Sequence, residues 1–408
     1  MIKKLNIGII TADSNGAYPV PAVNGGAVST LIETLIRDNS EKGIVNFTIF
    51  SFYTIEAYKA SKKYKNVKFV WVKVPKIYKI MDKFFFYLIK KIKKVKAISY
   101  KSIFSLIYYI YYVSRHLKHY NFDKLILENN IPIAWIIRFS KYRGKYYYHF
   151  HNIPRINAGC RKVFEKCTAY LCVSNYLAKK ISSPSSPIGP IDAQKIRVLY
   201  NTIDTDLFFV NPILDKKRLK FKYKIGLNDK VILFVGRLNK QKGIDAVINA
   251  VKLLYEKNIK LVIVGSLMYG TNVKDSYINN LRSKITEIPD KVIFTGYISQ
   301  QDLPAMYNIA DVVVLPSLWG EAAGLTMIEA LSCGASVITT NCGGISEYVN
   351  NYATLLEVDD KLVKNIAKSI SREIALSNDL ELKEERHKYI RDNFSNKKYL
   401  YKFIKVLN

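Results

Sequence analysis

The sequence has few cysteines and no long uncharged apolar run. Its five cysteines include no C-x-x-C pair, which argues against structural zinc, and their odd number fits a reduced compartment better than a disulfide framework. The run LNIGII near the N-terminus is too short for a secretion signal, so we expect it to form the first strand. In the aromatic segment after Lys76, only residues 102–114 separate Lys101 from Arg115. A membrane-spanning helix needs about 20 apolar residues, so none is expected there.

Acidic residues are scarce: 33 Asp and Glu stand against 63 Lys and Arg, for a formal net charge of +30. Between Lys76 and Tyr120, aromatic clusters alternate with basic residues that include Lys90, Lys91, Lys93, Lys94, Lys96 and Lys101. A basic, aromatic, helical segment is typical of contact with an anionic membrane surface. A helix pair with a solvated basic face explains this pattern equally well, and biased codon usage is another source of the charge. Nucleic acid is the least favoured partner, because no recognised nucleic-acid module accompanies the charge.

The length and the apolar pattern indicate two α/β domains. A chain of 408 residues with 49% hydrophobic residues and a mean hydropathy near zero is not disordered, and it can build two cores. Short Val/Ile-rich runs such as VILFVG, KLVIVG and DVVVLP, mostly bounded by Gly or Pro, alternate with helical stretches. This alternation predicts doubly wound parallel sheets. The Ser- and Pro-rich residues 181–192 interrupt the pattern, and we interpret them as a surface loop or a hinge.

Residues 319–330, WGEAAGLTMIEA, carry two glutamates eight positions apart, Glu321 and Glu329. The preceding run DVVVLPSL predicts a buried strand, and LTMIEALSCG predicts the start of a helix. Glu321 is therefore expected on the loop at the carboxyl end of the strand, where open α/β sheets bind ligands. Glu329 is expected inside the helix. Such a pair of carboxylates suits polyhydroxylated rings, and the bare helix amides at Gly324 and Leu325 suit a phosphate.

Residues 230–247, KVILFVGRLNKQKGIDAV, predict a strand, a Gly turn, a basic loop and a helix. Arg237 and Lys242 flank that loop. Two cations at a strand-to-helix turn are what a pyrophosphate leaving group needs when no metal neutralises it. Solvated loop cations are the plainer alternative.

VGRLNKQKG followed by the E-x7-E segment resembles family 4 of the retaining glycosyltransferases. The resemblance is closest to members that build bacterial cell-surface polysaccharides or glycosylate spore-coat material. It spans most of the chain and is weakest between about residues 50 and 120. Further family landmarks follow in the expected order: residues 18–28 (YPVPAVNGGAV), 146–154 (YYYHFHNIP), 171–177 (LCVSNYL), 199–208 (LYNTIDTDLF) and 340–347 (TNCGGISE). Thr202 replaces a family Gly, and Ala323 replaces the common Phe, which enlarges the pocket expected beside the donor sugar.

The resemblance implies the GT-B fold, with two Rossmann-like domains facing each other across a cleft. Residues 1–198 would form the acceptor-binding domain, and residues 199–383 the nucleotide-sugar-binding domain. A helix of residues 384–408 would pack back on the first domain.

The resemblance also implies roles for the candidate residues. Arg237 and Lys242 would hold the leaving diphosphate, and Glu321 would contact the donor sugar. Glu329 would bind ribose hydroxyls, and His151 would meet the donor sugar, with His149 as its neighbour in the strand. Gly25 and Gly26 permit close backbone approach at a helix N-terminus, so their amides can face the pyrophosphate.

The predicted function is transfer of a sugar, with retention, from a nucleoside diphosphate sugar to a glycan or lipid-linked hydroxyl in bacterial surface polysaccharide synthesis. The donor, a UDP- or GDP-sugar, is a substrate, and no permanently bound cofactor is expected. No Asp-x-Asp motif stands beside a plausible donor site, so no metal is expected either. The enzyme is predicted to be cytoplasmic and peripheral at the inner face of the membrane. Two rival classes stay open: a nucleotide-sugar epimerase of the same fold, and a non-catalytic basic protein that binds membranes or nucleic acid.

Overall fold

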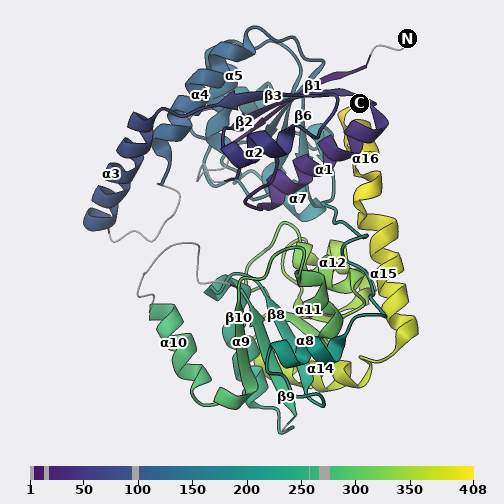
Figure 1. Ribbon diagram of the computed structural model, residues 1–408. Helices are drawn as coiled ribbons and strands as arrows, with labels where there is room; N and C mark the ends of the chain where they lie inside the picture. Colours follow the sequence, from purple (N-terminus) through teal and green to yellow (C-terminus); the bar gives the residue numbers. More distant parts are fainter. Residues whose placement is uncertain (1–3, 13–17, 94–100, 257, 266–275) are drawn as a thin grey trace. The chain divides into compact units, whose positions relative to one another are not determined.

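The computed structural model describes residues 4–12, 18–93, 101–256, 258–265 and 276–408. These residues form two compact units. The first comprises Met1–Tyr200 with Lys397–Asn408, and the second comprises Asn201–Asn396. Each unit is a parallel sheet with helices packed on it (Figure 1). The doubly wound α/β class predicted from the sequence is therefore confirmed.

The first unit holds a seven-stranded sheet in the order β3-β2-β1-β4-β5-β6-β7. Its strands are β1 (Asn6–Thr11), β2 (Asn46–Phe52), β3 (Val67–Val72), β4 (Lys124–Glu128), β5 (Tyr146–Phe150), β6 (Ala169–Cys172) and β7 (Ile196–Val198). Its helices are α1 (Ala27–Lys42), α2 (Ile55–Ser61), α3 (Lys76–Lys93), α4 (Ile103–Leu117), α5 (Ala134–Ser140), α6 (Arg161–Glu165), α7 (Asn175–Ser182) and α16 (Tyr399–Leu407). The strands at the centre are buried along nearly their whole length, because helices cover both faces of such a sheet.

The second unit holds a six-stranded sheet in the order β10-β9-β8-β11-β12-β13. Its strands are β8 (Lys230–Val235), β9 (Ile259–Val264), β10 (Val292–Gly296), β11 (Val312–Leu315), β12 (Ser336–Thr340) and β13 (Ala353–Leu356). Its helices are α8 (Lys216–Lys222), α9 (Ile244–Lys252), α10 (Ser276–Ile285), α11 (Leu303–Ile309), α12 (Leu325–Ser332), α13 (Ile345–Val349), α14 (Leu362–Ala375) and α15 (Leu380–Phe394). The Val/Ile-rich runs predicted as strands are the strands of this sheet.

In both sheets the strand order reverses beside the first strand. The chain winds outward from β1 to β3 and then returns to place β4 next to β1, and it repeats this with β8 to β10 and then β11. At such a reversal the loops leaving the two adjacent strands diverge, which opens a crevice outside their carboxyl ends. The loops that follow β1 and β4, and those that follow β8 and β11, are therefore the places where each unit can hold a ligand.

The C-terminal segment differs from the expected single helix of residues 384–408. It forms two helices, of which α15 groups with the second unit and α16 with the first. The chain leaves α15 at a short backbone bridge, in which Ile203 N–H donates to Phe394 O at 2.9 Å and Asn396 N–H donates to Ile203 O at 2.9 Å. Buried Arg386 donates to Gly334 O at 3.1 Å and fixes α15 to its unit. Only α16, through residues such as Phe403, joins the core of the first unit.

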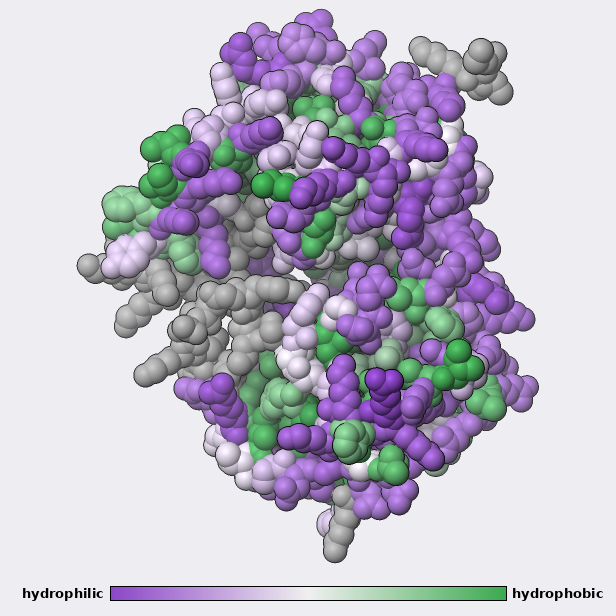
Figure 2. Space-filling view, in the orientation of Figure 1, coloured by the Kyte–Doolittle hydropathy of each residue, from purple (hydrophilic) through white to green (hydrophobic). Residues whose placement is uncertain are grey.

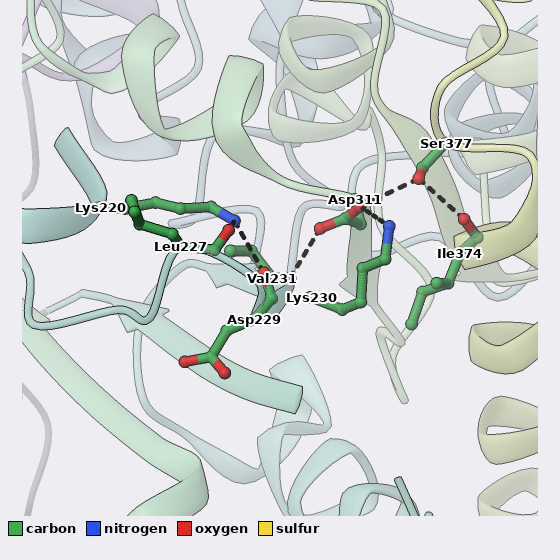
Figure 3. A network of polar contacts seen from close by, with 8 residues as sticks. All are labelled: Lys220, Leu227, Asp229, Lys230, Val231, Asp311, Ile374 and Ser377. Carbon is green, nitrogen blue, oxygen red and sulfur yellow. Dashed lines mark hydrogen bonds and ion pairs between the residues drawn. The ribbon is translucent and has the colours of Figure 1, made fainter. Parts of the chain in front are cut away.

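At the amino edge of the second sheet, Asp311 joins strand and helix ends. Its carboxylate accepts hydrogen bonds from Val231 N–H at 2.8 Å and Ser377 Oγ at 3.0 Å, and it lies 3.1 Å from Lys230 Nζ (Figure 3). This edge lies opposite the carboxyl ends of the strands. The network therefore stabilises the sheet and leaves the ligand-binding edge to other residues.

Candidate functional site

In the second unit, the loops after β8 and β11 meet at the point where the strand order reverses. Gly243 follows the 3₁₀ turn Lys240–Lys242 and has a φ of 68°. A Cβ atom at Gly243 would lie 2.0 Å from Pro316 O, just after β11. Leu318 N–H also donates to Gln241 O at 2.8 Å. Glycine is therefore required for the two loops to approach this closely.

This approach brings Lys242 and Glu321 together, although 79 residues separate them in the sequence. Lys242 Nζ lies 2.5 Å from Glu321 Oε1, and the Ser317 hydroxyl donates to the same carboxylate. The Lys242 side chain is 27% exposed and that of Glu321 is 14% exposed. Asn239 orients the turn, since its side chain accepts from Lys242 N–H at 3.1 Å. The site thus presents a half-buried cation and anion in contact, at the crevice where such sheets bind ligands.

The backbone of Glu321 is held by Gly343 and Gly344, which belong to the family landmark of residues 340–347. Gly344 N–H donates to Glu321 O at 2.7 Å. A Cβ atom at Gly343 would lie 2.3 Å from the same carbonyl oxygen, and the φ of Gly343 is 74°. The loop that carries Glu321 is therefore fixed from both sides, by the β8 loop and by the start of α13.

Arg237 and the start of α12 follow β8 and β11, at the same carboxyl edge of the sheet as this pair. Arg237 follows Gly236 at the end of β8, and its side chain is exposed. Gly324 caps α12, which begins at Leu325, and Gly324 O accepts from Met327 N–H at 3.1 Å. The N-terminal amides of α12 therefore point towards the edge that also carries Lys242 and Glu321.

Glu329 is buried inside α12, as the sequence suggested. The Tyr307 hydroxyl donates to its carboxylate at 3.1 Å. Burial raises the pKa of Glu329 to about 7, and the hydrogen bond from Tyr307 only partly opposes that effect. A carboxyl group in this position has a strong need for further hydrogen-bond donors once it is ionised.

The raised pKa predicts that Glu329 makes stability depend on pH. Below about pH 4.5 the group is protonated in both the folded and the unfolded chain, whereas between pH 4.5 and 7 only the folded chain keeps the proton. The free energy of unfolding should therefore fall as pH rises through this range, by about 3 kcal/mol. Glu329→Gln removes the titration. Between pH 5 and pH 7.5, urea unfolding should show the stability of the variant relative to the parent rising by about 2 kcal/mol. An equal difference at both pH values would contradict the prediction.

In the first unit, Gly25 and Gly26 lie immediately before α1. Their φ angles are 73° and 98°, in the region that favours glycine. A Cβ atom at Gly26 would lie 3.0 Å from the Tyr18 ring, and Gly26 O accepts from Thr30 N–H at 2.9 Å. The two glycines thus permit a tight turn into a 16-residue helix. Close approach of a phosphate to the first amides of α1 is compatible with this geometry.

At the carboxyl ends of β4 and β5, three buried side chains form a cluster. The sequence analysis named its two histidines but not its glutamate. His149 Nδ1 and His151 Nε2 each lie 3.1 Å from Glu128 Oε2. Burial alone would raise the pKa of Glu128, but the two imidazoles, His149 foremost, outweigh it and lower this pKa to about 2. Burial, with His149 close by, lowers the pKa of His151 to about 4. Glu128 is therefore an ionised acceptor, and His151 is neutral at pH 7.

We call Glu128, His149 and His151 the His-Glu-His cluster. Their charge states decide which atom donates and which accepts in each hydrogen bond. An ionised carboxylate only accepts, so His149 Nδ1 and His151 Nε2 must both carry protons and donate to Glu128. In neutral His151 the other ring nitrogen, Nδ1, is then an acceptor, and it is buried with no hydrogen-bond partner among the described residues. The ligand atoms of the three residues lie within 4.8 Å of one another, close enough to hold a metal ion. The two hydrogen bonds satisfy the carboxylate without an ion.

The sequence pattern pointed to His151 but not to Glu128. The segment DKLILENN could have indicated Glu128, because its apolar run predicts a strand that ends in a carboxylate and two asparagines. Asn129 Oδ1 accepts from His151 N–H at 3.0 Å and so fixes the backbone after β5. An acidic residue at the carboxyl end of a central parallel strand is expected to face the ligand crevice.

Comparison with known proteins finds a family match within the second unit. Residues 215–393 match the family described as "Glycosyl transferases group 1". An uncharacterized glycosyltransferase, MJ1607 of Methanocaldococcus jannaschii, is 34% identical over 212 residues, which are 51% of this chain and 51% of that protein. The lipopolysaccharide 1,2-N-acetylglucosaminetransferase of Salmonella typhimurium is 27% identical over 231 residues, 55% of this chain and 56% of that protein. The matched region spans about half the length of these curated relatives.

Solved structures show the fold of the whole chain. A glycosyltransferase from Rickettsia africae superposes with a TM-score of 0.74 at 19% identity, and the match covers 99% of this chain and 98% of that one. The Anabaena protein Alr3699/HepE, solved in complex with UDP and glucose, gives a TM-score of 0.68 at 15% identity, covering 99% of both chains. The predicted GT-B fold is confirmed by these likenesses.

Proposed function

We propose that this chain, whose residues 215–393 match the glycosyltransferase group 1 family, transfers a glycosyl unit from a nucleoside diphosphate sugar to a hydroxyl group. The observation that carries the proposal is the contact of Lys242 with Glu321 at the strand reversal of the family-matched unit. A cation for the diphosphate and a carboxylate for sugar hydroxyls stand there side by side. A UDP- or GDP-sugar is the proposed donor, and the UDP and glucose bound by the Anabaena neighbour support this class of donor.

In the proposed reaction, the bond between the anomeric carbon and the diphosphate oxygen breaks as a bond to the acceptor oxygen forms. The acceptor proton passes to the departing phosphate, on the same face, so the configuration is retained and no enzymic nucleophile is needed. Arg237 and Lys242 stabilise the charge that develops on the leaving group without a metal ion. When the diphosphate pairs with Lys242 in place of Glu321, the Glu321 carboxylate becomes available to the donor sugar.

The remaining candidate residues complete the proposed site. Glu329 accepts hydrogen bonds from the ribose hydroxyls, which meet its need for donors. Gly324 and Leu325 offer amides to the diphosphate. In the first unit, Gly25 and Gly26 permit close approach of a phosphate to the first amides of α1. His151 receives a hydroxyl of the donor sugar on Nδ1, the acceptor nitrogen that Glu128 leaves free.

A donor screen tests this function. Purified protein is incubated with UDP-, GDP- and ADP-sugars, with and without a crude lipid-linked glycan acceptor, and released nucleoside diphosphate is measured. We expect release from a subset of donors, stimulated by acceptor and lost in Glu321→Ala. Conversion of one nucleotide sugar into another without acceptor would identify an epimerase instead. Failure of every donor, with nucleotide binding unaffected by Glu321→Ala, would identify a non-catalytic binder.

The proposed acceptor is a glycan or lipid-linked glycan of the bacterial surface, made at the inner face of the membrane. The Salmonella relative, named for its action on lipopolysaccharide, supports this class of acceptor. No described helix is both long and apolar enough to cross a bilayer. The membrane contact proposed here is peripheral.

Helix α3 supports such contact. Ile77, Ile80, Phe84 and Tyr87 recur at helical spacing and are each between 57% and 64% exposed, so they form one apolar stripe on α3. Figure 2 shows apolar side chains interspersed with hydrophilic ones over this helix. Asp82 anchors α3 to α4 by accepting from Phe104 N–H at 2.7 Å. An amphipathic helix with an outward apolar stripe suits the interface of a membrane. The side chains of Lys90, Lys91 and Lys93, and all of residues 94–100, lie outside the described part of the chain.

Vesicle sedimentation tests the membrane contact. Phe84→Glu should lower the fraction bound to vesicles that contain phosphatidylglycerol, because it places a charge on the apolar stripe. Ile213→Glu is the matched control, since Ile213 is 90% exposed and lies in the second unit. Equal binding to vesicles of phosphatidylcholine alone, or no effect of Phe84→Glu, would remove this part of the proposal.

A further inference from the structure

A groove between α4 and α5 in the first unit takes no part in the proposed transfer reaction. Its volume is about 570 Å³, within the range of ligand pockets in proteins. Ile107, Ile110, Tyr111, Trp135 and Phe139 make most of its wall, and Ser114, Arg115 and Lys118 complete it. We propose that this groove binds an acyl chain of an anionic membrane phospholipid, which deepens the membrane contact proposed above and is independent of catalysis.

The apolar wall is the first observation that favours a hydrocarbon chain. Ile107, Tyr111 and Phe139 are 53%, 57% and 54% exposed, although they lie around one hollow. Contiguous exposed apolar surface of this kind marks an interaction site, because water contact with it is unfavourable. A sugar or a nucleotide would find few hydrogen-bond partners on such a wall, whereas an alkyl chain would need none.

Contacts within the protein also fix the side chains that line the groove. Trp135 Nε1–H donates to Ala158 O at 3.0 Å, and the Arg138 guanidinium lies 4.6 Å from the centre of a Trp135 ring. Trp135 and Phe139 pack with ring centroids 5.1 Å apart. On the facing helix, Ser114 Oγ donates back to Ile110 O at 2.6 Å, so it does not present an unpaired hydroxyl to the groove. The groove is thus preorganised for an apolar occupant.

Charge is distributed unevenly along the groove. Both helices run antiparallel to the strands, since α4 leads into the amino end of β4 and α5 follows its carboxyl end. Ile107 and Trp135 therefore lie towards the carboxyl edge of the sheet, and Arg115 and Lys118 towards the amino edge. Arg115 and Lys118 are exposed, and the Arg115 guanidinium lies 5.8 Å from the centre of the Tyr111 ring.

This polarity fits an amphiphile in one orientation. The anionic headgroup would lie at Arg115 and Lys118, and the chain would run between the helices towards Ile107 and Trp135. The two cations at one end of the groove can form ion pairs with a phosphodiester at a partly dehydrated surface. A zwitterionic headgroup brings its own cation to the same place and should bind less tightly.

A monomeric short-chain lipid tests the site without a bilayer. Dioctanoylphosphatidylglycerol, kept below the concentration at which it forms micelles, is titrated into the full-length protein and followed by calorimetry and tryptophan fluorescence. We expect saturable binding of one lipid per chain, and weaker binding of dioctanoylphosphatidylcholine. The fluorescence change should vanish in Trp135→Phe while calorimetric binding persists. An unchanged fluorescence response in that variant would place the lipid elsewhere and overturn the proposal.

Two charge variants and one control sharpen the test. Ile107→Glu and Arg115→Glu alter exposed side chains, so the fold should survive, and each should weaken binding by about tenfold or more. Ile213→Glu, an exposed change in the second unit, should leave the affinity unchanged. Equal weakening by all three variants, or no saturable binding by the parent, would overturn the proposal. Phe84→Glu should reduce vesicle binding and spare monomer binding, which separates the groove from α3. Nucleoside diphosphate release in solution should continue in Ile107→Glu.

Discussion

Replacing Lys242 with alanine should lower kcat by about 10²–10³-fold, equivalent to about 2.7–4 kcal/mol in the barrier, as the loss of one preorganised charge donor does in other enzymes. The ammonium lies at the strand reversal, half-buried and held 2.5 Å from Glu321. A cation fixed in this way needs little reorganisation when charge develops on the leaving diphosphate. The effect should appear mainly in kcat, because the charge on the diphosphate grows as the bond to the sugar breaks.

The neighbouring lysine provides the control for this prediction. Lys240 opens the same 3₁₀ turn but is exposed, so Lys240→Ala makes the same change in net charge without removing the contact to Glu321. Its kcat should stay close to that of the parent. Steady-state rates of nucleoside diphosphate release, with the melting temperature of each variant, make the comparison. A loss of less than about tenfold in Lys242→Ala, or about 1.4 kcal/mol, would contradict the leaving-group role.

The parallel strands could be predicted from the sequence because each is a short, nearly continuous apolar run with a clear boundary. VILFVG and DVVVLP are examples, and Gly236 and Pro316 end them where the structure ends β8 and β11. Buried parallel strands leave this trace because both of their faces are covered. The loops that follow such strands carry the ligand in this fold, so Arg237, Lys242 and Glu321 could be placed at one edge without knowledge of any contact.

Contacts between distant segments could not be predicted in the same way. Nothing local to Glu128 reveals that two imidazoles meet on its carboxylate, since those rings come from the next strand. The break between α15 and α16 depends on a backbone bridge to Ile203, almost 200 residues away. The tail was predicted as one helix of residues 384–408. Local propensity is a weak guide where tertiary contacts decide the outcome.

The His-Glu-His cluster leads to the second large effect, on stability. In Glu128→Ala, the Nδ1–H of His149 and the Nε2–H of His151 would both lose their acceptor in a buried site. Removal of one partner from a buried, charged hydrogen-bonded group costs about 3–5 kcal/mol, because the groups left behind stay desolvated. The free energy of unfolding of the first unit should fall by that amount at pH 7. Chemical denaturation followed by the fluorescence of Trp71 and Trp135, which both lie in this unit, measures it.

Glu128→Gln separates the charge from the shape of this side chain. The amide keeps the volume and one acceptor oxygen, so one imidazole stays satisfied while the amide N–H group faces the other donor. The loss should be roughly half of that in Glu128→Ala. In the glutamine variant His151 is free to take the other tautomer, with the proton on Nδ1. If His151 Nδ1 accepts a sugar hydroxyl, this variant should show a lower kcat than its folded fraction explains. A loss of stability below about 1 kcal/mol in Glu128→Ala would mean that the carboxylate does not hold the two rings, since a single neutral hydrogen bond already contributes that much.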